Sequence, residues 1–257
     1  MSPNVPSWTG VAASLVLVLV AAGIARRGRL GVERDLLVAS VRAFVQLVAV
    51  GAILSFLFLH AGVLGALLWM TAMVLVGGYE ASRRAKGLPR ALRSATLGIG
   101  IGAATTLGIL LVFHVISTEP RVLVPVGGMV ISGCMNIAAI VLRGLRTSAV
   151  EQRSQVEARL ALGLGARDAL APLIRATVRM ATIPAIDTTK VVGIISLPGA
   201  MTGLILAGVD PLTAIRYQIV VMYMLLAAGA VTALVTSRLA EAALFDDALR
   251  LRRMPAG

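Results

Sequence analysis

The chain has 257 residues, of which 58% are hydrophobic and only 14% are charged. A soluble domain carries roughly a quarter charged residues, so this composition excludes an ordinary soluble globular protein. Repeated apolar runs of about 20 residues instead predict an all-α, polytopic membrane protein that forms one domain over residues 1–257. Basic loops beside the membrane account for the net charge of +12, and we expect a lipid bilayer and no nucleic acid as partner.

Seven apolar runs are long enough to cross a hydrocarbon core of about 30 Å as helices. The positive-inside rule then gives an orientation, because nearly all of the 24 Lys and Arg residues fall on one side of these spans. It predicts an N-terminus outside and a cytoplasmic C-terminus, in the cell inner (plasma) membrane. The predicted spans cover residues 8–25, 36–59, 61–78, 95–117, 122–142, 191–208 and 214–237.

The longest stretch that we expect outside the lipid is the basic segment 143–190, between the fifth and sixth predicted spans. Ser148, followed three residues later by Glu151, has the form of a capping box, which predicts that a helix begins there. The glycines around Gly163 would end that helix, and a second helical pattern covers residues 166 to about 181. A helix–turn–helix unit of this kind outside the membrane is suited to contact with a soluble partner.

Two predicted spans contain residues that interrupt helices. Pro125 lies in the fifth span, and Pro198 lies in the sixth. A broken helix exposes backbone groups that are tolerated at membrane depth only beside protein or a wet cavity, so these breaks indicate a substrate route. Simple kinks are the alternative. The residues that we assign to this route are Met129, Met135, Asn136, Pro198, Gly199 and Met201.

Methionine offers a soft thioether ligand, but it is also an adaptable filler of apolar cores, so packing is an alternative role for these side chains. Arg42 and Gln46 are further candidates for the route, because they lie one turn apart on one face of the second span. An intramembrane arginine is costly and is therefore a candidate for function. Alternatively, Arg42 extends toward the cytoplasmic surface or pairs with a neighbouring helix.

The sequence contains no nucleotide-binding glycine loop, no metal-ligand spacing of His and Cys, and no catalytic triad pattern. We therefore expect no catalytic residue, no metal ligand and no cofactor in this chain. The interiors of the predicted spans carry no Asp or Glu, which disfavours a stand-alone secondary carrier driven by an ion gradient. Such a carrier for a small solute stays an alternative, and the interrupted spans disfavour a membrane scaffold.

Small residues recur at a spacing that lets helices approach closely in lipid. Gly98 and Gly102 have a Gly-x-x-x-Gly spacing in the fourth span, and Gly199 and Gly203 have it in the sixth. The sequence leaves two interpretations open, which are close packing within one subunit and contact between two copies of the chain.

Several motifs carry a family resemblance. Glu157-Ala158 followed by Gly163 resembles the Glu-Ala-Ala…Gly loop of ABC-transporter permeases, with Arg159 at the position of the second alanine. More specific matches are Gly133-Cys134-Met135-Asn136 and the segments 191–203, 205–211 and 217–222. Together these motifs resemble FetB-type permeases, membrane subunits of ABC transporters that are associated with iron export. The N-terminal third matches that family mostly in hydropathy.

The resemblance implies a homodimeric permease that pairs with a separate cytoplasmic ABC-type ATPase, on which ATP and Mg would bind. It implies export of iron or another metal ion, with transport of a nucleotide sugar as the alternative. It also implies a coupling helix that docks into the ATPase, whose residues here are Glu157, Ala158, Gly163 and Gly165.

Overall fold

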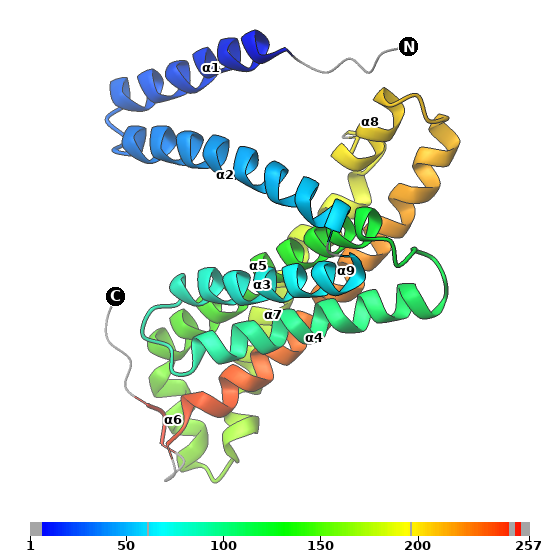
Figure 1. Ribbon diagram of the computed structural model, residues 1–257. Helices are drawn as coiled ribbons and strands as arrows, with labels where there is room; N and C mark the ends of the chain where they lie inside the picture. The colour runs from blue at the N-terminus through cyan, green and yellow to red at the C-terminus, as the bar shows by residue number, and fades with distance from the viewer. Residues whose placement is uncertain (1–6, 61, 196, 247–249, 253–257) are drawn as a thin grey trace.

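The computed structural model describes residues 7–60, 62–195, 197–246 and 250–252. Within these ranges the chain is helical apart from turns and an isolated antiparallel bridge between Phe245 and Leu251, so the all-α prediction is confirmed (Figure 1). The helices are α1 (Trp8–Arg27), α2 (Glu33–His60), α3 (Gly62–Arg83), α4 (Ala91–Val112), α5 (Pro120–Glu151), α6 (Arg153–Ala161), α7 (Ala166–Val191), α8 (Gly199–Leu206) and α9 (Pro211–Leu244).

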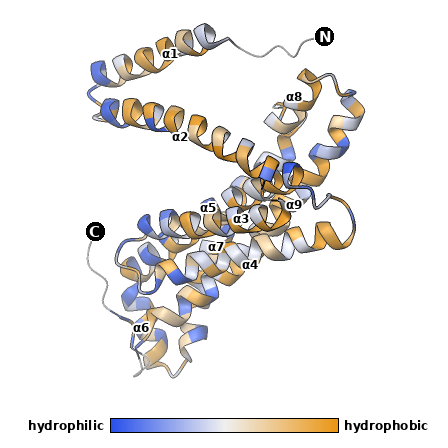
Figure 2. Cartoon of the chain, in the orientation of Figure 1, coloured by the Kyte–Doolittle hydropathy of each residue, from blue (hydrophilic) through white to orange (hydrophobic). Residues whose placement is uncertain are grey.

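Seven helices in the described part of the chain are long and apolar enough to cross a membrane, namely α1, α2, α3, α4, α5, α7 and α9. The predicted count of seven spans is therefore confirmed. Apolar residues dominate the middle of these helices, whereas hydrophilic residues gather at the α1–α2 turn and at the end of the bundle around α6 (Figure 2). This distribution is the one that a bilayer requires.

The sixth span lies elsewhere than predicted. Helix α7 runs without a break through Pro172 and Pro184 and packs against α5 and α9. The predicted span at 191–208 instead contains a turn and the short helix α8. The segment 143–190 is therefore not wholly outside the membrane, because its second half is a membrane-spanning candidate. Only α6 and its flanking turns stay as a polar unit between two spans.

Three local predictions can be compared with these helices. Helix α5 continues through Pro125, so the predicted break in the fifth span is wrong. Pro125 is the sixth residue of this helix, so its missing N–H leaves the carbonyl of Arg121 without the usual helical donor, and the helix accommodates that loss. Helix α5 also continues past Ser148 to its last residue, Glu151, so no new helix begins at the predicted capping box. The turn at Gly163 is confirmed, since its φ of +86° favours glycine.

Helices α3, α4, α5 and α9 form the centre of the bundle, and α7 packs along α5 and α9. Gly98 and Gly102 of α4 lie directly against Thr236 and Thr232 of α9. The Gly-x-x-x-Gly spacing of α4 is therefore used for close packing within one subunit. For the other pair, Gly199 and Gly203, no described atom lies within 4 Å of where a Cβ would be.

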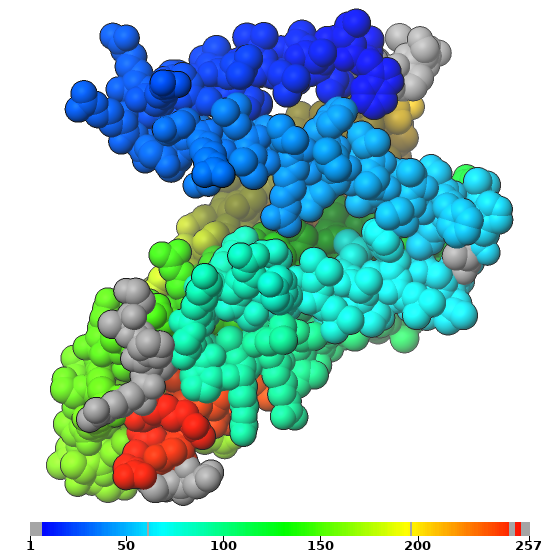
Figure 3. All heavy atoms as spheres, turned by 60° about the vertical axis from the view of Figure 1, so that its left-hand side comes forward, coloured from blue at the N-terminus to red at the C-terminus, as the bar shows by residue number. Residues whose placement is uncertain are grey.

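The α1–α2 hairpin stands away from the bundle (Figures 1 and 3). Helix α2 contacts α3 and α5 near its C-terminal end, where Leu57 is buried. Along the rest of the hairpin most apolar side chains are exposed, including Leu17 and Leu47, each 72% exposed. In a bilayer these side chains face lipid, so their exposure there carries no free-energy cost.

The position of the sixth span can be tested by cysteine labelling. Lys190 pairs with Asp187 at the C-terminal end of α7, at 3.1 Å. If α7 spans the membrane, Lys190→Cys and Leu162→Cys are expected to react with a membrane-impermeant maleimide from opposite faces. A Cys134→Ser background supplies the control, because Cys134 is the chain's only cysteine. Labelling of both positions from one face would restore the predicted span at 191–208. Asn4 and Ala256, which suit a test of the termini, lie outside the described residues.

Candidate functional site

A cavity of about 550 Å³, here called the central cavity, lies between α5, α7, α8 and α9. Helix α5 contributes Met129 and Asn136 to its wall, and the connection from α7 to α8 contributes Pro198 and Gly199. The structure thus brings four of the predicted route residues to one cavity. Their role in transport stays a prediction.

Other residues of this wall were not among the predicted route residues. They are Thr188 and Thr189 of α7, and Gln218 and Met222 of α9. The two threonines were missed because the end of α7 was assigned to a loop outside the lipid. Gln218 could have been found, since it is an isolated amide in an apolar run of the seventh span.

A second cavity of about 590 Å³ adjoins the first. Met201 of α8, another predicted route residue, lines this adjoining cavity. Thr189, Pro198, Gln218 and Met222 line both cavities. The two spaces therefore meet at a shared wall formed by the end of α7, the start of α8 and one face of α9.

Gln218 is the most informative residue of this shared wall. Its side chain is 5% exposed, and its Oε1 atom is buried without a hydrogen-bond partner among the described residues. A buried acceptor without a partner costs about 1–3 kcal/mol. A ligand that donates a hydrogen bond at this position would remove that cost.

The remaining route candidates lie elsewhere. Met135 lies on another face of α5, where it lines a separate cavity of about 400 Å³ with Trp69 and Met73 of α3. Arg42 and Gln46 are exposed on α2, in the part of the hairpin that stands away from the bundle. The structure therefore does not unite these three residues with Met201 or with the central cavity.

The predicted coupling residues lie at the end of the bundle opposite α8, in what we call the α6 unit, residues 153–165 (Figure 1). Glu157, Ala158, Gly163 and Gly165 are all exposed. Leu162, at the tip of the unit, is 81% exposed, although it is apolar. Leu164 beside it is 40% exposed, so the tip presents two apolar side chains to its surroundings.

Hydrogen bonds hold the α6 unit to its neighbours. The Arg159 guanidinium donates to the carbonyl of Ala169 in α7 at 3.1 Å. The Val156 side chain of α6 itself is fully buried. The Arg153 guanidinium forms an ion pair with Glu157 at 2.7 Å, so the Glu157 carboxylate already has a partner within this chain.

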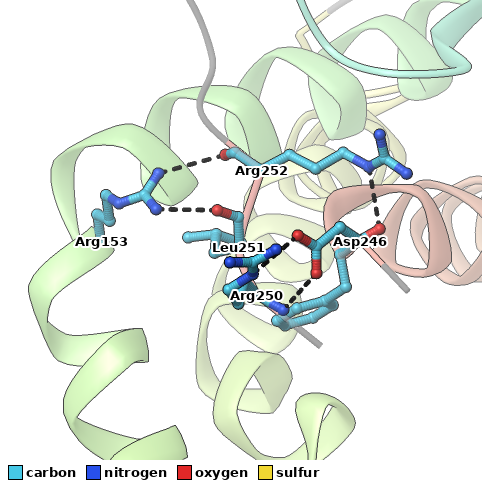
Figure 4. A network of polar contacts seen from close by, with 6 residues as sticks. Arg153, Asp246, Arg250, Leu251 and Arg252 are labelled. Atoms are coloured by element: carbon cyan, nitrogen blue, oxygen red, sulfur yellow. Dashed lines mark hydrogen bonds and ion pairs between the residues drawn. The ribbon is translucent and has the colours of Figure 1, made fainter. Parts of the chain in front are cut away.

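Arg153 also binds the C-terminal hook, which we define as residues 244–246 and 250–252 (Figure 4). Its guanidinium donates to the carbonyl of Leu251 at 2.9 Å and to that of Arg252 at 3.3 Å. Leu251 is 3% exposed, and its bridge to Phe245 folds the hook back on the end of α9. One arginine thus joins the start of α6 to the end of the described chain.

Comparison with known proteins places the chain in a family. The model of the uncharacterised protein family UPF0014 matches residues 8–245. The chain belongs to the UPF0014 family. The predicted resemblance to FetB-type permeases is confirmed, because the UPF0014 relatives include the "Probable iron export permease protein FetB" of Escherichia coli (strain K12). That protein is 34% identical over 225 residues, which cover 88% of this chain and 87% of the relative.

Two plant relatives are also similar. The "UPF0014 membrane protein STAR2" of Oryza sativa subsp. japonica is 39% identical over 239 residues, covering 93% of this chain and 84% of the relative. The "Protein ALUMINUM SENSITIVE 3" of Arabidopsis thaliana is 35% identical over 241 residues, covering 94% of this chain and 88% of the relative. No solved structure matched this UPF0014 chain.

Proposed function

We propose that this UPF0014 chain is the membrane permease subunit of an ATP-driven (ABC) transporter that exports iron or another metal. The α6 unit is the observation that carries the proposal, because it presents an exposed leucine, Leu162, directly after a short helix held between two spans. The naming of the Escherichia coli relative as a probable iron export permease supports the same function.

In this proposal the working unit contains two copies of the chain and two ATPase subunits, which bind ATP and Mg. The N-terminus lies outside and the C-terminus lies in the cytoplasm, so the α6 unit meets the ATPase. Closure of the ATPase pair displaces α6 as a rigid body. The hydrogen bond from Arg159 to Ala169 passes this displacement to α7.

Helix α7 links the two functional ends of the molecule. It begins at Ala166 beside the α6 unit and carries Thr188 and Thr189 into the wall of the central cavity. The distance from Ala166 to Thr189 along this helix is about 35 Å at a rise of roughly 1.5 Å per residue. A tilt of α7 therefore changes the cavity wall without any contact between the ATPase and the cavity.

The test is co-purification of the permease with an ATPase encoded beside it, followed by measurement of ATP hydrolysis in lipid without iron, with free ferrous ion and with chelated iron. Complex formation and iron-stimulated hydrolysis are the expected results. A permease that binds no ATPase and transports in response to an ion gradient would show the alternative, a stand-alone carrier.

Charge reversal of Glu157 tests the docking surface. Glu157→Lys breaks the ion pair with Arg153 and places two like charges one helical turn apart. We expect at least tenfold weaker recruitment of the ATPase, measured by pull-down titration, and no change in membrane insertion. Glu119→Lys is the matched control, because Glu119 is exposed at the start of α5, far from α6. Equal affinity for the ATPase in both variants and the wild type would show that Glu157 does not belong to the docking surface.

A further inference from the structure

The central cavity has walls of uncharged groups. The described residues that line it present thioethers, amides, hydroxyls and aliphatic carbon, and none of them is charged at neutral pH. Its volume of about 550 Å³ lies within the range of roughly 300–1,000 Å³ that is typical of sites for small organic molecules. Size and chemistry thus favour an organic ligand over a single ion.

The polar groups of the cavity are few and placed on different helices. Asn136 lies on α5, Thr188 and Thr189 lie on α7, and Gln218 lies on α9. The Thr189 hydroxyl is already bonded to the carbonyl of Ala185 in its own helix, at 2.8 Å. Gln218 differs, because its buried Oε1 has no partner among the described residues. Gln218 lines the wall common to both cavities while its Oε1 is covered by neighbouring atoms, so a rotation of the side chain presents this acceptor to a ligand.

A metal cation would be poorly stabilised between these walls. Transfer of a charged group from water into an apolar site is costly unless an opposite charge or a full set of polar ligands replaces its hydration shell. The thioethers of Met129 and Met222 suit soft ions such as Cu(I), whereas ferrous and ferric ions prefer harder ligands. A neutral complex brings its own ligands and avoids this cost.

We propose that the central cavity binds an uncharged organic ligand that donates an N–H or O–H hydrogen bond to Oε1 of Gln218, so that a metal cargo enters as a neutral chelate and not as a free ion. The proposal rests on the proposed function only in placing this cavity on the transport route. Apolar walls contact the organic shell, and Gln218 selects a complex with a hydrogen-bond donor. The ATPase takes no part in this binding step.

The test uses the permease alone in lipid nanodiscs, so that failure to pair with an ATPase does not affect it. The probe is ferric tris(acetohydroxamate), an uncharged complex with N–H donors on its outer surface, and free ferrous ion is the comparison. Equilibrium dialysis measures bound iron. We expect saturable binding of the complex at about one per chain, and no saturable binding of free ferrous ion.

Gln218→Leu gives the sharper result, because two readouts should move in opposite directions. Loss of the hydrogen bond is expected to weaken binding of the complex about tenfold. Removal of an unpaired buried acceptor is expected to leave the thermal midpoint of the ligand-free protein equal or higher. Met73→Leu is the control, because Met73 of α3 lines the separate cavity of about 400 Å³, and this variant should bind the complex as the wild type does.

Three outcomes would overturn the proposal. The first is saturable binding of free ferrous ion that Gln218→Leu leaves intact. The second is failure of the wild type to bind the complex, including the case in which native mass spectrometry finds a phospholipid that the complex does not displace. The third is equal affinity of Gln218→Leu and Met73→Leu for the complex. None of these results depends on whether an ATPase partner exists, which the co-purification experiment decides separately.

Discussion

Replacement of Gly102 by leucine is expected to destabilise the bundle strongly. Gly102 lies against Thr232 of α9, and a Cβ at this position would also be 3.0 Å from the carbonyl oxygen of Ala228. Because backbone atoms form part of this contact, α4 and α9 must separate to admit a side chain. Overpacking of this kind costs about 3 kcal/mol, which would lower the thermal midpoint in detergent by about 6–12 °C.

Gly108 supplies the matched control within the same helix. No described atom lies within 4 Å of where its Cβ would be, so Gly108→Leu introduces the same side chain without a clash. Gain of helix propensity is expected to leave the midpoint equal or slightly higher. An equal loss of stability in both variants would show that α4 and α9 are not packed as described.

Loss of Arg153 is expected to uncouple the chain from the proposed ATPase partner without unfolding the bundle. The guanidinium holds Glu157 on α6 and the carbonyls of Leu251 and Arg252 in the hook. Glutamine cannot span these three acceptors, so Arg153→Gln should free α6 from the hook. We expect about tenfold weaker ATPase binding and a lower ratio of iron-stimulated to basal hydrolysis, with a thermal midpoint close to that of the wild type.

A double-mutant cycle shows whether Arg153 acts through the hook. Leu251→Ala removes the buried side chain that anchors the hook, so its effect on ATPase binding should not add to that of Arg153→Gln. Additive effects of the two substitutions on ATPase binding would show that Arg153 does not act through the hook. Arg83→Gln is the charge control, because the contacts of Arg83 with Glu80 at 3.9 Å and with the Tyr79 ring at 5.7 Å both lie within its own helix, α3. Arg153→Lys keeps the charge but lacks the forked geometry, and partial rescue is expected.

Much of the fold could be predicted from the sequence, because each span needs about 20 apolar residues and such runs can be recognised directly in the sequence. The sixth span was misplaced for a physical reason. Helix α7 carries Asp187 and Lys190 at its end, which pair with each other, and Thr182, Thr188 and Thr189 bond to their own helix, so this polar content does not prevent packing against α5 and α9. The run at 191–208 is more apolar, but Gly193 with a φ of +81° turns the chain there.

The candidate site was predictable only where local sequence marks it. Pro198 and Gly199 interrupt an apolar run, and Asn136 is a polar residue in another, so these positions could be identified. Met129 and Met135 look alike in the sequence, yet they line different cavities. The packing of α3 on one side of α5 and α7 on the other separates them, and that arrangement depends on contacts between distant parts of the chain.

The position of the α1–α2 hairpin has a consequence for how its sequence can change. Side chains that face lipid need only be apolar, because acyl chains adapt to any shape, whereas a protein neighbour demands a matching volume. Exposed positions such as Leu17 and Leu47 should therefore accept isoleucine, valine or phenylalanine with little effect. A segment under so loose a constraint retains its hydropathy while its residue identities drift, so relatives of this chain are expected to share hydropathy more than residue identity along this hairpin.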